Sequence, residues 1–450
     1  MDRRSFVHRT VGGVAALGAL RALSACRPDA PSAAEDADFV AVRERYFLTT
    51  LELNPVTCTY LGGDGYSATL TPVNGRLRDF SPTALGNEVT FLQSVLTALA
   101  TIPVDTLTSQ SRIDHAVVQA QAGYMVHQLA ERRYQERCVD TYVAEPFRGI
   151  DWQIQGMTDV GNGLLGTEQE WALVVARVGA VPAYVNVARE NLLAGKAAGN
   201  IPDRRLVARD GIAGAKANVD YFTTTLPGLA AEYIGDRPFA ATTVDQLKTA
   251  GTAAGAAYAG LATFMAETYD LNETIDRYAV GEEEYAWRVT NCLRDTRTPA
   301  ELYEYGAKQV EEYEAKIYRV AQEVSKDSGL GLAFGSDAEQ RASVRAVMDY
   351  LAKDSPKNDT ELFDWYRETG VRAVAYGRQQ QMFDIPADYQ LVVTETPPVL
   401  RSTTDASYYP APPFKTTGVG RFYLTPTDND PGALKLNNRS SVATTAIHEG

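Results

Sequence analysis

Residues 298–324 read TPAELYEYGAKQVEEYEAKIYRVAQEV. Thr298 is a typical helix N-cap, the proline after it suits the first helical turn, and Glu301 can return a hydrogen bond to the cap. Apolar side chains then recur every three or four residues, at Val310, Tyr313, Ile317, Val320 and Val324. Because this spacing places them in one stripe, the stretch predicts a long amphipathic helix.

The same start signal recurs elsewhere in the chain and predicts a mainly α fold. A capping residue followed three positions later by Glu or Gln occurs at Thr167, Thr243, Ser336 and Asn358. Strand signals are confined to residues 390–394 and 421–425, each closed by proline. Another helix is expected to begin near residue 441. We therefore expect one large helical domain over residues 39–450, with a small β-sheet near its C-terminal end.

The first residues look like an export signal rather than part of the fold. Arg3 and Arg4 are adjacent and precede Ser-Phe, which resembles a twin-arginine signal, and the apolar stretch 11–20 is too short to span a bilayer. Leu23-Ser24-Ala25-Cys26 resembles a lipobox, in which cleavage precedes a cysteine that then carries lipid. We expect residues 1–25 to be a signal peptide and Cys26 a membrane anchor in the bacterial envelope, either periplasmic or outer-membrane. The alternative is an unstructured basic N-terminus.

The composition of the chain limits which membrane segments, partners and metal sites can be expected. Residues 26–38 are rich in Pro, Ala, Asp and Ser, which predicts a flexible tether. No later segment approaches 18 uninterrupted apolar residues, so no membrane-spanning helix is expected. The net charge of −14 argues against nucleic acid as a partner. No Cys-x-x-Cys pair exists, and only four histidines are present: His8, His115, His127 and His448.

The strongest chemical signal is the final tripeptide, His448-Glu449-Gly450. In HExxH peptidases a helix presents two histidines to zinc, and the glutamate beside the first histidine activates water. The residues before His448 are small and apolar, which fits a buried helix. The extended segment 421–425 precedes it, and in thermolysin-like enzymes an edge strand beside the zinc helix pairs with the substrate backbone.

Residues 445–450, TAIHEG, resemble the opening of the motif His-Glu-Gly-x-Pro-Gly-His-His. That motif marks domain of unknown function 885, a bacterial family of candidate zinc-dependent peptidases. Residues 53–62, 181–192, 281–302 and 420–423 resemble other family segments in the same order. The resemblance implies a thermolysin-like zinc helix beginning at the C-terminus, with His448 as a zinc ligand, Glu449 as the catalytic residue and a peptide as substrate.

Residues near the extended segment are candidates for substrate binding. Arg421 and Tyr423 lie on it, and Tyr408, Tyr409 and Lys415 precede it. Aromatic and cationic groups there could bind the side chains or the carboxylate of a peptide. The alternative is that these residues pack a loop against the core.

The sequence stops before the second histidine pair of the motif. Because catalytic zinc usually needs three protein ligands, we expect the chain to be an inactive fragment, with zinc held only in the complete protein. The leading hypothesis is an exported lipoprotein with zinc metallopeptidase activity when complete. The alternative is a non-catalytic helical envelope lipoprotein that binds peptides or protein partners.

Overall fold

A computed structural model describes residues 37–382, 384–401, 404–415 and 419–449. The described chain is mainly helical, as the sequence predicted. The expectations for Arg3, Arg4 and Cys26 lie outside the described residues. Where the sequence suggested a single domain over 39–450, the chain divides into two compact units. Unit 1 runs to Asp295 and includes 398–402 and 412–417, and unit 2 comprises 296–397, 403–411 and 418–450.

Unit 1 is a layered set of helices with one small hairpin, β1 (Asp159–Gly161) and β2 (Leu164–Leu165). Its α-helices are α3 (Ala37–Leu53), α4 (Pro55–Leu61), α5 (Gly63–Tyr66), α6 (Pro82–Ala100), α7 (Ser109–Val126), α8 (Val139–Gln155), α9 (Glu168–Ala197), α10 (Arg204–Leu206), α11 (Gly214–Asp220), α12 (Leu226–Ile234), α13 (Ala240–Thr268) and α14 (Glu282–Asn291). Short 3-10 or π turns also belong to this unit, among them η3 (His127–Glu131), η4 (Tyr134–Glu136), η6 (Tyr221–Thr225) and η7 (Pro398–Leu400).

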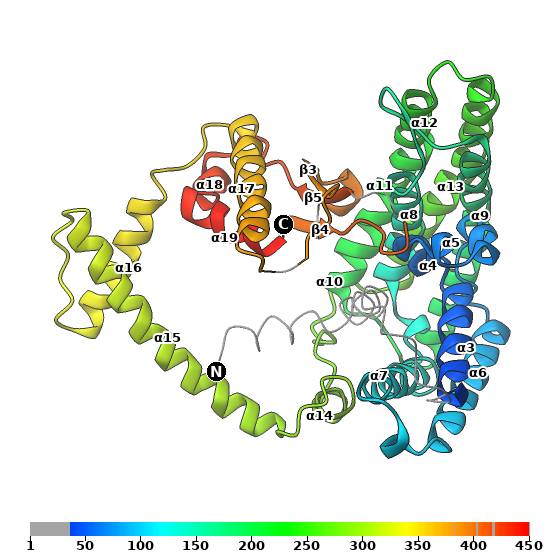
Figure 1. Ribbon diagram of the computed structural model, residues 1–450, viewed down its shortest axis with the longest axis horizontal. Helices are drawn as coiled ribbons and strands as arrows, with labels where there is room; N and C mark the ends of the chain where they lie inside the picture. Colours follow the sequence, from blue (N-terminus) through cyan, green and yellow to red (C-terminus); the bar gives the residue numbers. More distant parts are fainter. Residues whose placement is uncertain (1–36, 383, 402–403, 416–418, 450) are drawn as a thin grey trace. The chain divides into compact units, whose positions relative to one another are not determined.

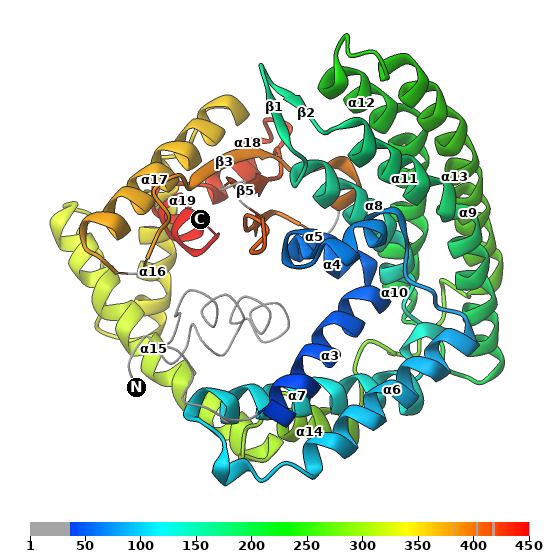
Figure 2. The same ribbon diagram turned by 45° about the vertical axis from the view of Figure 1, so that its right-hand side comes forward.

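Helix α9 packs beside α13 in unit 1 (Figures 1 and 2). It begins at the predicted capping box, in which Thr167 and Glu170 exchange hydrogen bonds. Among the described residues, α9 is the helix long and apolar enough to cross a membrane. Its side chains Trp171, Val174 and Val178 are fully buried in the core of the unit, which accounts for its apolar composition without a bilayer.

The segment 412–415 packs against the N-terminal helices of unit 1. The Phe414 N–H donates to the Leu61 carbonyl at 3.1 Å, and Lys415 Nζ lies 3.0 Å from an Asp64 carboxylate oxygen. Lys415 also donates to the Gly156 carbonyl at 3.1 Å. Its ammonium group is therefore held by partners within unit 1, which argues against the substrate contact considered from the sequence.

The described residues of unit 2 form five helices and a three-stranded sheet. Its elements are α15 (Pro299–Asp327), α16 (Asp337–Leu351), α17 (Asp359–Gln379), β3 (Gln390–Glu395), β4 (Ala406–Tyr409), β5 (Val419–Leu424), α18 (Pro431–Leu436) and α19 (Arg439–Glu449). The strand order is β3-β5-β4, with β3 parallel and β4 antiparallel to β5. Apolar side chains of the sheet, α17 and α19 form the core of this unit, including Val393, Phe422, Leu362 and Val442.

Most of the predicted helix starts are confirmed. Thr298 caps α15 through a full capping box, and Ser336 and Asn358 accept capping hydrogen bonds at the starts of α16 and α17. The prediction for Thr243 is wrong, because α13 already begins at Ala240 and Thr243 is buried inside its first turns. A capping signal in the sequence does not exclude a helix start further upstream when tertiary packing favours that start.

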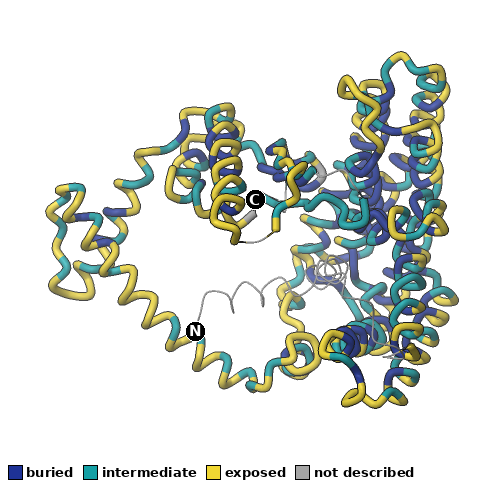
Figure 3. The backbone as a smooth tube through the Cα atoms, in the orientation of Figure 1, coloured by how far each residue is buried: buried dark blue, intermediate teal, exposed yellow. Residues whose placement is uncertain are grey.

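The apolar stripe of α15 is helical as predicted but largely exposed. Val310, Tyr313, Ile317 and Val320 keep 49–60% of their surface accessible. Figure 3 shows α15 mostly in the colour of exposed residues. Its buried positions, Ala321 and Ser325, lie near its C-terminal end, and the helix contacts α16.

Candidate functional site

Helix α19 carries the half-motif found in the sequence. Its start is fixed by Asn438, whose side-chain oxygen accepts hydrogen bonds from the backbone N–H groups of Ser440 and Ser441 at 3.1 and 3.2 Å. Val442 and Ala446 are buried against the core of unit 2, whereas His448 is exposed. Glu449 is the last helical residue. The predicted helix is therefore present, and its packing places His448 on a surface of unit 2.

The strand that carries Arg421 and Tyr423 is not an edge strand. In β5, Arg421 is paired with Val392 of β3 on one side and with Tyr409 of β4 on the other. Since both sides of its backbone are already paired, β5 cannot accept a peptide by strand addition. Tyr423 is only 4% exposed, which removes it from a direct substrate contact. The expectation that this strand pairs with substrate is therefore corrected.

The edge strand that contacts α19 is β4, which carries Tyr408 and Tyr409. The sequence carried no strand signal here. The Tyr408 hydroxyl lies 2.8 Å from the Tyr389 hydroxyl, and the Tyr409 ring packs edge-on against Tyr423 with centroids 5.0 Å apart. Burial raises the pKa of the Tyr389 hydroxyl. Both candidate tyrosines are thus half-buried parts of the sheet, in which β4 pairs with β5 on one side only among the described strands.

Gly420 allows the two tyrosine hydroxyls to meet over the sheet. A Cβ atom at this position would lie 2.5 Å from the Tyr389 oxygen and 2.6 Å from the Tyr408 oxygen. Such distances are far below van der Waals contact, so any larger side chain would displace the pair. The glycine that precedes Arg421 therefore has a packing role on this face of the sheet.

A cavity of about 790 Å³ lies beside α19 within unit 2. It is lined by residues of α17, the segment after it, β4 and α19: Thr369, Arg372, Ala373, Val374, Tyr376, Gly377, Met382, Asp384, Ile385, Pro386, Tyr389, Tyr408, Ala443 and Ile447. Most of these side chains are apolar, and Tyr376, Met382 and Ile447 are more than half exposed. Ile447 is the residue directly before His448. The cavity therefore adjoins the half-motif and has the size and lining of a site for an apolar group.

Sequence reasoning missed the α17 wall of this cavity. Arg372 and Tyr376 are one helical turn apart and belong to an amphipathic helix whose polar face carried no recognisable motif. The sequence contained no sign that this face would lie next to Tyr408 and Ile447. Only the packing of α17 on α19 and the sheet brings them together.

The described residues do not make a complete zinc site. Of the motif, they include His448 and Glu449, and nowhere in the described ranges do three His, Cys, Asp or Glu side chains come together in a metal-holding arrangement. His115 and His127, two of the four histidines, are engaged elsewhere. His115 Nε2 lies 3.1 Å from the Leu99 carbonyl, and the His127 ring lies between two glutamates.

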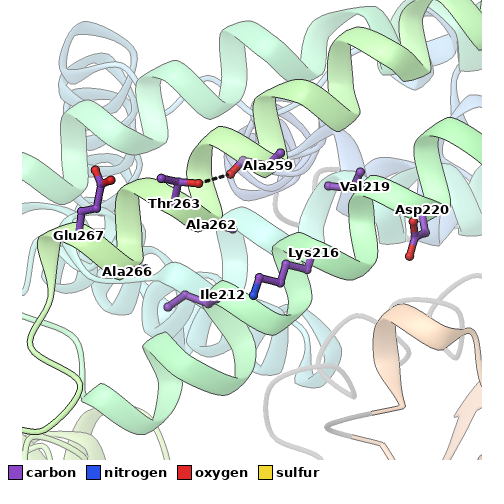
Figure 4. A pocket seen from close by; sticks show the side chains of 9 residues that line it. All are labelled: Ile212, Lys216, Val219, Asp220, Ala259, Ala262, Thr263, Ala266 and Glu267. Carbon is purple, nitrogen blue, oxygen red and sulfur yellow. Dashed lines mark hydrogen bonds between the residues drawn. The ribbon is translucent and has the colours of Figure 1, made fainter.

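Unit 1 has a second hollow, of about 590 Å³, between α11 and α13 (Figure 4). Its floor is formed by small side chains, among them Ala259, Ala262 and Ala266. Lys216, Asp220 and Glu267 also line it. None of the residues that the sequence singled out lines this hollow, so the cavity beside α19 is the better candidate site.

Comparison with known proteins places these features in a family. The DUF885 family, described as bacterial protein of unknown function, matches residues 55–450. A solved structure of a candidate lipoprotein of unknown function from Shewanella oneidensis has a TM-score of 0.63 and 18% identity. The crystal structure of a candidate lipoprotein from Colwellia psychrerythraea has a TM-score of 0.67 and 14% identity. Each alignment covers 92% of this chain and 70% of the other chain. At these identities the likeness concerns the fold alone. No curated protein matches the chain.

Proposed function

Because the chain belongs to the DUF885 family of bacterial proteins of unknown function, we propose that it is an exported lipoprotein whose C-terminal unit binds peptides in the cavity beside α19. The observation that carries the proposal is the contact of three features: a largely apolar cavity, an edge strand and the helix that bears His448. An apolar cavity beside an edge strand suits an extended peptide, since a sheet edge can pair with a peptide backbone and the cavity can take a side chain.

Lipid anchoring is the second part of the proposal. It is supported by the lipobox-like Leu23-Ser24-Ala25-Cys26 and by the two solved structures of similar fold, both from candidate lipoproteins. The mass of the mature N-terminus tests it. A chain that begins at Cys26 with a diacylglycerol group is expected, and a chain with the first 25 residues intact would contradict it.

Filling the cavity should prevent peptide binding. Ala443 lines the cavity, so Ala443→Trp is expected to weaken the binding of an apolar peptide by at least about tenfold, because the indole would occupy the ligand's space. Thr444→Trp is the matched control, since Thr444 is exposed and is not part of the cavity lining. Binding to both variants is measured by fluorescence anisotropy with a labelled peptide. Equal affinity in the two variants would mean that peptides do not use this cavity.

Catalysis is proposed only for a form of the protein that also carries the rest of the motif. There His448 would hold zinc together with ligands that follow it, and Glu449 would act as the general base. In such a form, Glu449→Gln is expected to lower peptide hydrolysis by roughly 10²–10⁴-fold while zinc stays bound. Zinc content and turnover are measured on the same preparation. Unchanged turnover with zinc retained would remove Glu449 from the reaction and favour the alternative, a peptide-binding lipoprotein without catalysis.

A further inference from the structure

Two charged side chains line the cavity beside α19, whose other lining is mostly apolar. Arg372 lies on α17, and Asp384 lies on the segment between α17 and β3. The cavity therefore brings a positive and a negative group to the walls of one space of about 790 Å³. In a largely apolar pocket the few polar groups decide which ligand binds and how it is oriented.

Neither of these charges has a partner in the described part of the chain. The side chains of Arg372 and Asp384 form no ion pair or hydrogen bond there, either with one another or with any other described residue. Glu368 lies one helical turn before Arg372, at a spacing at which ion pairs commonly form, yet these two side chains do not pair. The guanidinium group and the carboxylate are therefore both available to a ligand in the cavity.

Three hydroxyl groups of the lining, in contrast, are already bonded within the protein. The Thr369 hydroxyl donates to the Trp365 carbonyl at 2.8 Å. The hydroxyls of Tyr389 and Tyr408 lie 2.8 Å apart and bond to one another. The two charged side chains are therefore the strongest groups left in the cavity to orient a ligand.

The wall that carries Asp384 is fastened to α17. Arg378 Nη2 donates to the Pro386 carbonyl at 2.7 Å and to the Tyr389 carbonyl at 3.3 Å. Because Arg378 belongs to the same helix as Arg372, these bonds connect the two charged walls of the cavity without using either charge. A site whose walls are fixed before binding loses less entropy when a ligand enters.

We propose that the cavity takes a short apolar peptide with both ends free, whose carboxylate binds Arg372 and whose ammonium group binds Asp384. The inference rests on the proposed peptide binding and names the kind of peptide. Guanidinium groups bind carboxylates through paired N–H donors, and such pairs gain strength when the ligand excludes water from them. A fatty acid or an amine would satisfy one charge and cover the other without a partner, which is unfavourable, whereas a zwitterionic peptide satisfies both.

Matched ligands test the two ends of the peptide separately. The tripeptide Leu-Ala-Leu is compared with its N-acetyl form and its C-amide form, and the dissociation constant of each is measured by isothermal titration calorimetry at one ionic strength. Each modification removes one terminal charge and leaves the apolar side chains unchanged. Each is therefore expected to weaken binding by about tenfold, because one charged partner in the cavity is left unpaired.

Variants assign each end to its residue. Arg372→Gln should weaken binding of the free peptide by about tenfold and should no longer distinguish it from the C-amide form, because both then lack the same ion pair. Asp384→Asn should in the same way lose the preference over the N-acetyl form. A purely structural role would instead weaken all three forms equally.

Control variants keep the test specific to the cavity. Arg345→Gln on α16 and Asp388→Asn change exposed residues outside the cavity lining and should bind all three forms as the unmodified protein does. If Arg372→Gln fails to fold, Arg372→Lys is the second variant. It retains the positive charge and should therefore still prefer the free peptide over the C-amide form.

Two outcomes would overturn this inference while peptide binding itself stands. They are equal affinity for the free, acetylated and amidated peptides, and end preferences that persist unchanged in the Arg372→Gln and Asp384→Asn variants. Failure of the proposed function gives a different result: none of the three forms binds, or Ala443→Trp leaves the affinity for the free peptide unchanged. Either of those results would remove the proposed function and this inference with it.

Discussion

Replacing Arg177 by methionine should lower the free energy of unfolding of unit 1 by about 2–4 kcal/mol. Arg177 lies on α9 and has no exposed surface. Its guanidinium donates to the carbonyls of Arg76 and Gly149 at 2.9 and 2.6 Å and to the Thr59 hydroxyl at 2.8 Å. Methionine fills similar space but leaves these buried acceptors without a donor. Burial lowers the pKa of Arg177 to about 9, so the side chain stays charged at neutral pH.

The effect is measured by urea and thermal unfolding, followed by the fluorescence of the four tryptophans, of which Trp152, Trp171 and Trp287 belong to unit 1 and Trp365 to unit 2. Arg189→Met is the matched control on the same helix, because Arg189 is exposed and its removal should change stability by less than about 1 kcal/mol. The unfolding free energy of the Arg177→Lys variant should fall between those of the Arg177→Met and Arg189→Met variants, since an ammonium group cannot reproduce the planar set of donors. Equal stability of the Arg177→Met and Arg189→Met variants would show that the buried hydrogen bonds contribute nothing net.

The second large effect concerns two glycines of α13. A Cβ atom at Gly251 would lie 2.1 Å from the Phe222 carbonyl oxygen of η6, whereas a Cβ at Gly260 meets nothing within 4 Å. Gly251→Ala should therefore destabilise unit 1 by about 1–3 kcal/mol, because a backbone atom must move to make room. Gly260→Ala should stabilise it by about 0.5–1 kcal/mol, since alanine lowers the entropy of the unfolded chain.

The pair is informative because both changes add the same methyl group to the same helix. Their difference in unfolding free energy therefore reports the contact with η6 and not helix propensity. Thermal and urea unfolding measure it. Stabilisation of similar size by both substitutions would show that α13 and η6 do not pack as closely as described.

Local signals along the chain predicted the secondary structure well. The capping boxes at Thr167 and Thr298 and the two strand runs were recognisable because caps and β-branched runs act over a few neighbouring residues. The mainly α fold followed from them. The predictions failed where a distant segment decides the outcome. Thr243 is inside a helix that starts earlier, and Tyr408 and Tyr409 form a strand where the sequence carried no strand signal.

By itself the sequence determined the helices, the family resemblance and the helix that bears His448. Only the tertiary structure decided that Arg421 lies in a central strand, that Tyr408 lies at an edge, and that Ile447 lines a cavity. The physical reason is the range of the interactions. Caps and helical stripes depend on neighbours within one or two turns, whereas strand order, cavities and charge clusters depend on contacts between segments far apart in the chain, which one sequence does not specify.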